Sequence, residues 1–201
     1  YAPETRETIN NLYNPLFKVP LQILYYVPAF CGLIIGFYKY WSFMLDESAV
    51  VPVKKSRWLR NLLLSFSAVI FFELMVDPMV VNAKLPSWSY FYRDVSIIMS
   101  GVWIIVIWLA TTIIDRLFIQ LDLSKKFVLY LVAATFIMVP VEAWFIQNGF
   151  RIYGPSAVAN FTGFHSFPFN VPLEVTFAIP LYLALVISLI RYWQITFDNK
   201  Q

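Results

Sequence analysis

Long apolar segments dominate this sequence and restrict what it can fold into. A helix needs about 20 mostly apolar residues to cross the hydrocarbon core of a bilayer. Segments of this kind occupy residues 19–45, 58–82, 95–114, 127–147 and 171–194. We therefore predict an all-α, polytopic bundle of about five transmembrane helices, which forms a single integral membrane domain over residues 1–201.

The composition excludes several classes of protein. Apolar residues make up 60% of the chain and charged residues only 13%, whereas soluble domains carry about 25% charged residues. The net charge of +3 is small and gives no sign of a nucleic-acid partner. Because the chain has one cysteine and one histidine, it has neither an internal disulfide nor a cysteine- or histidine-based metal centre. We expect no metal and no cofactor.

Lysine and arginine residues are unevenly distributed between the two ends of the predicted helices. One end carries Lys54, Lys55, Arg57, Arg60, Arg116, Lys125, Lys126, Arg191 and Lys200. The opposite end carries Arg6, Lys18, Lys84, Arg93 and Arg151. Because cytoplasmic loops are enriched in basic residues, we predict a multi-pass protein whose C-terminus is cytoplasmic.

Two connections on the predicted outer side are unusually aromatic. Leu85–Asp94 is aromatic and amphipathic, as expected of a segment at the membrane interface. Asn148–Val171, between the fourth and fifth helices, contains five phenylalanines. This loop is too apolar to be solvated, and we expect it to fold back over the helix ends as a lid or re-entrant segment.

Four carboxylates lie inside the apolar segments. Glu73 and Asp77 belong to the second segment, Glu142 to the fourth and Glu174 to the start of the fifth. A charge at membrane depth costs roughly 3 kcal/mol or more. In the predicted orientation all four lie at a similar depth in the outer half of the bilayer, where they can converge on one cavity beneath the long loop.

These acids also have a purely structural interpretation. Intramembrane carboxylates can hold helices together by hydrogen bonds, and Glu174 at a helix start suits the helix dipole. Pro78 and Pro140 lie close to Asp77 and Glu142. Their kinks are either ordinary features of membrane helices or a means of opening a pocket.

The combination of acids and rings suggests a chemistry. An acid in an apolar site is held protonated and can donate its proton to an alkene, and aromatic rings stabilise the cation that forms. A polyene or isoprenoid lipid that enters sideways from the bilayer is the expected substrate. The candidate catalytic residues are Glu73, Asp77, Glu142 and Glu174. The candidate substrate-binding residues are Phe72, Trp88, Tyr90, Trp144, Tyr153, Asn160, His165 and Asn170.

Short motifs in this set resemble two related families. The segment 72–80 with its Asp77-Pro78 pair, followed by Trp88, looks like the Asp-Pro motif and following Trp of the integral-membrane carotenoid hydratases. The segments around Glu142, 148–154 and 170–174 look like further motifs of that family. The pairs Pro140/Glu142 and Pro172/Glu174 are similar to the Pro-Leu-Glu-Glu motif of the membrane lycopene cyclases, although Val175 replaces its second Glu. The resemblance implies acid-catalysed, cofactor-independent addition of water to a carotene end, or its cyclisation.

Three functions follow from these observations. In the first, an isoprenoid hydratase or cyclase uses Glu73 and Asp77 as proton donor and cation stabiliser, and Glu142 as general base or second acid. In the second, a non-catalytic subunit of a larger membrane complex binds pigment or lipid through its aromatic residues, with His165 as a possible axial ligand. In the third, the acids form the relay of a proton-coupled carrier.

Overall fold

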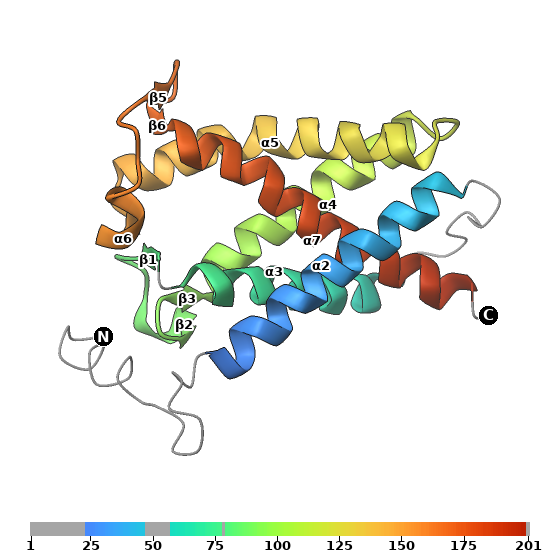
Figure 1. Ribbon diagram of the computed structural model, residues 1–201, viewed down its shortest axis with the longest axis horizontal. Helices are drawn as coiled ribbons and strands as arrows, with labels where there is room; N and C mark the ends of the chain where they lie inside the picture. Colours follow the sequence, from blue (N-terminus) through green and yellow to red (C-terminus); the bar gives the residue numbers. More distant parts are fainter. Residues whose placement is uncertain (1–22, 47–56, 78, 200–201) are drawn as a thin grey trace.

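The computed structural model describes residues 23–46, 57–77 and 79–199, and these are mostly helical. The long helices are α2 (Ile23–Leu45), α3 (Trp58–Val76), α4 (Ile97–Leu117), α5 (Leu123–Gln147) and α7 (Leu173–Asn199), and a short helix α6 (Pro155–Val158) precedes α7. The prediction of a helical bundle is confirmed at this level. The only strands in the described part of the chain are short pairs, and they gather at one end of the bundle (Figure 1).

Among the described helices, α3, α4, α5 and α7 are long and apolar enough to cross a membrane. The helix α2 is not one of these, and residues 19–22 of the first predicted span lie outside the described residues, so the fifth span stays a prediction. The second predicted span, 58–82, is too long at its C-terminal side, because α3 ends at Val76 and residues 80–82 form a strand. The helices α4, α5 and α7 begin and end within a few residues of the remaining three predicted spans.

The helix α7 lies at the centre of the bundle and packs against α2, α3 and α5, while α4 packs against α3 and α5 (Figure 1). One cluster of buried apolar side chains draws on all five long helices. Leu183, Val186 and Ile187 of α7 are completely buried in it. The contact between α2 and α7 is so close at Gly36 that a Cβ there would lie 3.0 Å from the Cα of Leu189, as is common where small residues join membrane helices.

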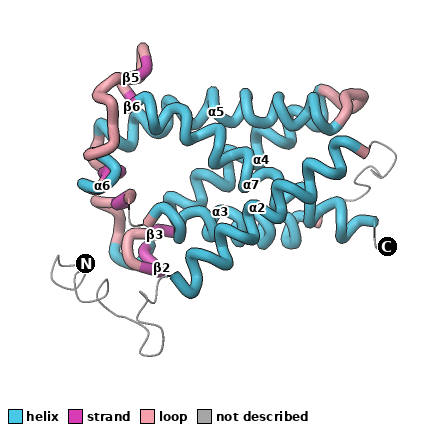
Figure 2. Tube along the Cα trace, viewed as in Figure 1, coloured by secondary structure: helices cyan, strands magenta, loops and turns pink. Residues whose placement is uncertain are grey.

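Three antiparallel strand pairs form at the end of the bundle where α3 and α5 terminate (Figure 2). The strand β1 (Val80–Asn82) pairs with β4 (Arg151–Tyr153). The other pairs join β2 (Tyr90–Tyr92) to β3 (Val95–Ser96), and β5 (His165–Ser166) to β6 (Val171–Pro172). The β1–β4 pair links the chain after α3 to the chain after α5, and it brings the acids of these two helices to the same end. We call this end of the bundle the strand end.

The long aromatic loop has three different parts. Its first part forms β4 and α6, and Phe161 then contributes to the wall of a cavity. Its last part is the β5–β6 hairpin, where Phe164 and Phe167 are strongly exposed. The predicted lid over the helix ends therefore corresponds at most to the part from β4 to Phe161, and its position in a membrane stays a prediction.

Candidate functional site

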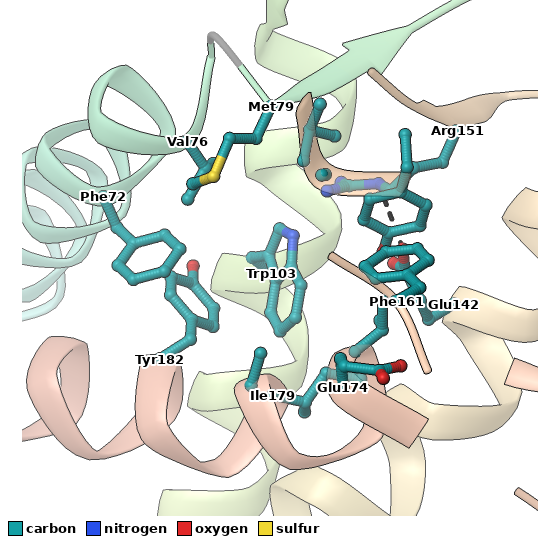
Figure 3. Close-up of a pocket in the computed structure, with 15 residues that line it drawn as sticks. Phe72, Val76, Met79, Trp103, Glu142, Arg151, Phe161, Glu174, Ile179 and Tyr182 are labelled. Atoms are coloured by element: carbon teal, nitrogen blue, oxygen red, sulfur yellow. Dashed lines mark hydrogen bonds and ion pairs between the residues drawn. The ribbon is translucent and has the colours of Figure 1, made fainter. Parts of the chain in front are cut away.

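A cavity of about 210 Å³ lies at the strand end of the bundle, next to the first turns of α7. Its wall is mostly apolar and aromatic, and Glu142, Arg151, Tyr153 and Glu174 are polar exceptions (Figure 3). The remaining lining residues are Phe72, Val76, Met79, Val80, Trp103, Ala157, Phe161, Val175, Ala178, Ile179 and Tyr182. The cavity can therefore hold an apolar group with a polar atom at one end.

Glu142 of α5 is the most buried acid of the site, at 1% exposure. The Tyr153 hydroxyl donates a hydrogen bond to its Oε1 over 2.5 Å. The Nε atom of Arg151 lies 3.5 Å from the same oxygen. The second oxygen, Oε2, is buried and has no hydrogen-bond partner among the described residues.

Arg151 and Tyr153 reach Glu142 together because side chains alternate along a strand. Both belong to β4 and point to one face, whereas Ile152 between them is 49% exposed. Pairing of β4 with β1 places Arg151 opposite Asn82 and Tyr153 opposite Val80. The strand pair therefore holds the cation and the phenol over the end of α5.

Arg151 is the shared cation of two acids. It interacts electrostatically with Glu142 and with the buried Glu73 of α3. Burial lowers the pKa of Arg151, but these two carboxylates raise it more, and the pKa lies above its ordinary value. Burial and the neighbouring Glu142 also raise the pKa of the Tyr153 hydroxyl well above its ordinary value. The site thus contains a permanent cation and a neutral phenol donor.

Asp77 has a different partner from the other acids. It follows the last turn of α3, and its Oδ2 lies 3.2 Å from Nη1 of Arg93 in a buried ion pair. The backbone N–H of Asp94 and the Tyr26 hydroxyl also lie within 3.5 Å of its oxygens. Asp77 interacts electrostatically with Glu73, but it does not line the cavity.

Glu174 joins the loop to the first turn of α7. Its Oε1 accepts a hydrogen bond from the backbone N–H of Thr162 over 2.6 Å, and its side chain forms part of the cavity wall (Figure 3). The structure therefore places Glu142 and Glu174 at the cavity, Glu73 within electrostatic reach of Arg151 and Asp77 in a separate ion pair.

The predicted substrate-binding residues divide into two groups. Phe72 and Tyr153 line the cavity. The others do not: Tyr90 donates a hydrogen bond to the backbone of Asn82, and the exposed ones are Trp88, Trp144, Asn160, His165 and Asn170. Sequence reasoning missed Trp103, Tyr182, Arg93 and Arg151. The two arginines were counted only as outer-side charges, although an arginine in an aromatic loop next to intramembrane acids is a signal for a counterion.

Trp103 and Tyr182 form the aromatic floor of the cavity with Phe72. The ring of Tyr182 lies edge-on to Phe72 and Trp103, with centroid distances of 4.2 and 4.3 Å. Figure 3 shows Phe72 and Tyr182 on one side of the cavity, Arg151, Glu142 and Phe161 on the other, and Trp103 between the two groups. Within the described ranges, no group of His, Cys, Asp and Glu side chains is arranged to hold a metal ion.

Comparison with known proteins gives no relative for this chain. No family model, no curated protein and no solved structure matches it. The resemblance to carotenoid hydratases and cyclases therefore stays a prediction, and the function has to be argued from the site.

Proposed function

We propose that this protein is a membrane enzyme that transfers a proton to or from the end of a polyene or isoprenoid lipid bound in the cavity. The observation that carries the proposal is the Glu142 carboxyl group, bonded to Tyr153 and next to Arg151, at the polar side of an otherwise apolar and aromatic cavity. A hydratase or cyclase of carotenoid type is one form that this reaction can take.

Glu142 is the proposed proton-transfer residue. As the carboxylate partner of Arg151 it can take up a proton, and once protonated it can return that proton to a carbon of the bound lipid. In a hydration or cyclisation the proton adds to a terminal double bond, and the cation is lost when water adds or when a proton leaves. The rings of Phe72, Trp103 and Tyr182 can stabilise the positive charge.

The other acids receive supporting roles in this proposal. Glu73 shares Arg151 with Glu142, and Asp77 neutralises Arg93, so both act on the site through charge. Glu174 fixes the loop at the cavity wall through Thr162. This differs from the expectation that Glu73 and Asp77 donate the proton, because neither lines the cavity.

Deuterium transfer tests the reaction. Purified protein in lipid nanodiscs is incubated in deuterium oxide with lycopene, geranylgeraniol or farnesylacetone, and the mass of each recovered lipid is compared with that from protein-free nanodiscs. We expect at least one lipid to gain deuterium, and Glu142→Gln to lower the rate roughly 100-fold or more. Asp122→Asn, which alters an exposed ion pair with Lys125, is the matched control and should keep the wild-type rate. A Glu142→Gln protein as active as wild type overturns the proposal.

We propose further that the protein crosses the membrane several times with a cytoplasmic C-terminus. The supporting observations are four long apolar helices and the basic residues concentrated at the end opposite the strand pairs. After replacement of Cys31, the only cysteine, single cysteines are introduced at Asp122 or at the exposed Phe167. A membrane-impermeant maleimide should label the Phe167 position in intact cells and the Asp122 position only after lysis. The reverse pattern contradicts the orientation.

A non-catalytic lipid- or pigment-binding subunit is the second candidate. Strongly exposed aromatic side chains outside the cavity, at Trp88, Phe164 and Phe167, favour it, because such residues suit contacts with a lipid surface or with a membrane partner. Purification in a mild detergent followed by mass measurement separates the two proposals. A bound partner or pigment together with no deuterium transfer supports the subunit, whereas an isolated monomer counts against it.

A further inference from the structure

The β5–β6 hairpin, residues 164–172, carries two strongly exposed aromatic side chains. Phe167 is 96% exposed and Phe164 is 69% exposed. No Asp, Glu, Lys or Arg occurs between Arg151 and Glu174, so the hairpin has no acidic or basic side chain other than the histidine at its first strand. Large exposed rings that lack neighbouring charges indicate an interaction surface. The partner of this surface is therefore expected to be apolar and to need no opposite charge.

The base of the hairpin is held firmly, which gives its tip a defined position. The backbone N–H of Leu173 donates to the carbonyl oxygen of Phe164 over 2.9 Å. The hydroxyl of Thr176, in the first turns of α7, donates to Oγ of Ser166 over 3.0 Å. The aromatic tip therefore projects from a base that is fastened to α7.

The start of α7 sets the depth of the hairpin in a bilayer. The candidate span of α7, Leu173–Asp198, has 26 residues, which corresponds to about 39 Å at 1.5 Å per residue. Because the hydrocarbon core is only about 30 Å thick, the first turn of a centred α7 lies in the headgroup layer. Phe167 follows Ser166 directly, and the contact of Ser166 with Thr176 keeps the Cα of Phe167 within about 12 Å of that helix turn.

The direction of the hairpin favours lipid over a single protein partner. Figure 1 shows the β5–β6 hairpin standing out sideways from the long helices, beyond the outline of α5, with β2 on the opposite side of the same end. The β2 region also exposes aromatic rings, because Trp88 is 74% exposed and Phe91 is 49% exposed. One protein partner would cover one side, whereas lipid surrounds the bundle. Aromatic residues on opposite sides of one end fit the belt that membrane proteins form at the interface.

We propose that the β5–β6 hairpin anchors the strand end in the membrane interface, with the rings of Phe164 and Phe167 packed among the headgroups and the upper acyl chains. The proposal requires that α7 crosses the membrane, and it does not depend on the proposed proton transfer. Water reaches the headgroup layer, so the backbone of the tip stays accessible to a soluble thiol reagent. Phe161 and Glu174 flank the hairpin and line the cavity, so the anchor holds this part of the cavity wall next to the lipid.

Fluorescence quenching by spin-labelled lipids tests the contact. After replacement of Cys31 by serine, Phe167→Cys is labelled with nitrobenzoxadiazole and reconstituted into phosphatidylcholine vesicles that contain a lipid spin-labelled near the headgroup or near the chain end. The control carries the same label at Asp122→Cys, in a charged connection at the opposite end. Because interfacial groups enter only about 5–10 Å, the label at residue 167 should be quenched about threefold more than the control by the shallow spin label, and less by the deep one.

A second pair of variants tests whether the apolar tip causes the contact. The label is moved to Phe164→Cys, and the tip carries either Phe167→Asp or the conservative Phe167→Leu. Since a charged side chain favours water over the interface, Phe167→Asp should lower quenching of this label by the shallow spin label by about half or more, while Phe167→Leu should keep it. The exposure of Phe167 means that neither variant should disturb folding.

Three results overturn the inference. Equal quenching of the labels at residues 167 and 122 by the shallow spin label would place the tip in water. A label at residue 167 that is shielded both from the spin-labelled lipids and from iodide in solution would show that protein covers the tip. Equal quenching in Phe167→Asp and Phe167→Leu would show that the apolar ring does not hold the hairpin at the interface. Deuterium transfer together with any of these results supports the proposed reaction and contradicts only the anchor.

Discussion

Two clusters of an acid, an arginine and a tyrosine lie toward opposite ends of the bundle. They differ in how many of their buried polar atoms lack a hydrogen bond and in the space beside them. The strand-end cluster consists of Glu142, Arg151 and Tyr153. The second cluster consists of Asp115, Arg191 and Tyr130, on α4, α7 and α5. Residue types alone would assign both clusters the same role.

The second cluster satisfies its own hydrogen bonds and has almost no space beside it. Nη2 of Arg191 donates to Asp115 over 2.6 Å and Nη1 donates to Gln194 over 3.0 Å. The guanidinium also lies over the ring of Tyr130, 4.8 Å from its centroid, and the adjacent cavity measures about 10 Å³. In the strand-end cluster, Nε and Nη2 of Arg151 make no hydrogen bond, although Nε lies in the ion pair with Glu142, and the adjacent cavity measures about 210 Å³. Unused hydrogen-bonding atoms together with space distinguish a site from a link between helices.

The largest expected difference concerns the two arginines. Arg151→Met leaves the fully buried Glu142 without its cation and should lower the free energy of unfolding by about 3–5 kcal/mol. Arg191→Met leaves Asp115, whose side chain is 39% exposed, and should cost only about 1 kcal/mol because water screens the remaining charge. Denaturant titration in mixed micelles measures both changes. Equal losses would show that burial does not separate the two clusters.

Filling the strand-end cavity should affect ligand binding more than stability. Ala178 lies on the wall of the cavity, and Ala178→Leu should weaken binding of farnesylacetone about tenfold while the free energy of unfolding changes by about 0.5 kcal/mol or less. Val132→Leu, on the exposed face of α5, is the matched control and should change neither quantity. Unchanged binding in Ala178→Leu would place the ligand elsewhere.

The smallest effect is a difference in the alkaline pH dependence of stability. The pKa of Tyr153 is raised in the folded protein by burial and by Glu142, so its contribution is complete below the unfolded pKa of about 10. Above that pH the unfolded state loses this proton first, and stability falls until the folded pKa is reached. Wild type should therefore lose stability more steeply than Tyr153→Phe above about pH 10, by up to about 1.4 kcal/mol per pH unit. Parallel profiles would contradict the buried contact with Glu142.

The sequence predicted the helices well because long apolar runs and their spacing are local features. It also predicted that Glu73, Asp77, Glu142 and Glu174 converge on one cavity, and two of these four, Glu142 and Glu174, line it. The separation of Asp77 from this set could not be predicted, because it depends on α3 ending at Val76 and on the turn that presents Arg93.

The cation of the site could not be predicted for a related reason. Arg151 reaches Glu142 through the pairing of β1 with β4, and these strands are far apart in the chain and too short to show an alternating pattern. Trp144 was expected at the site but is exposed, since the rotation of α5 is set by packing against α4 and α7. Trp103 and Tyr182 lie within predicted spans, where nothing in the local pattern distinguishes them from other buried aromatic residues.

The most direct test compares the two acids that define the clusters. Deuterium transfer from deuterium oxide to the bound lipid is measured for wild type, Glu142→Gln and Asp115→Asn under the same conditions. We predict that Glu142→Gln loses roughly 100-fold or more of the rate, while Asp115→Asn is less stable but transfers deuterium at the wild-type rate. Loss of transfer in both variants, or in Asp115→Asn alone, would contradict the assignment of the strand-end cavity as the reactive site.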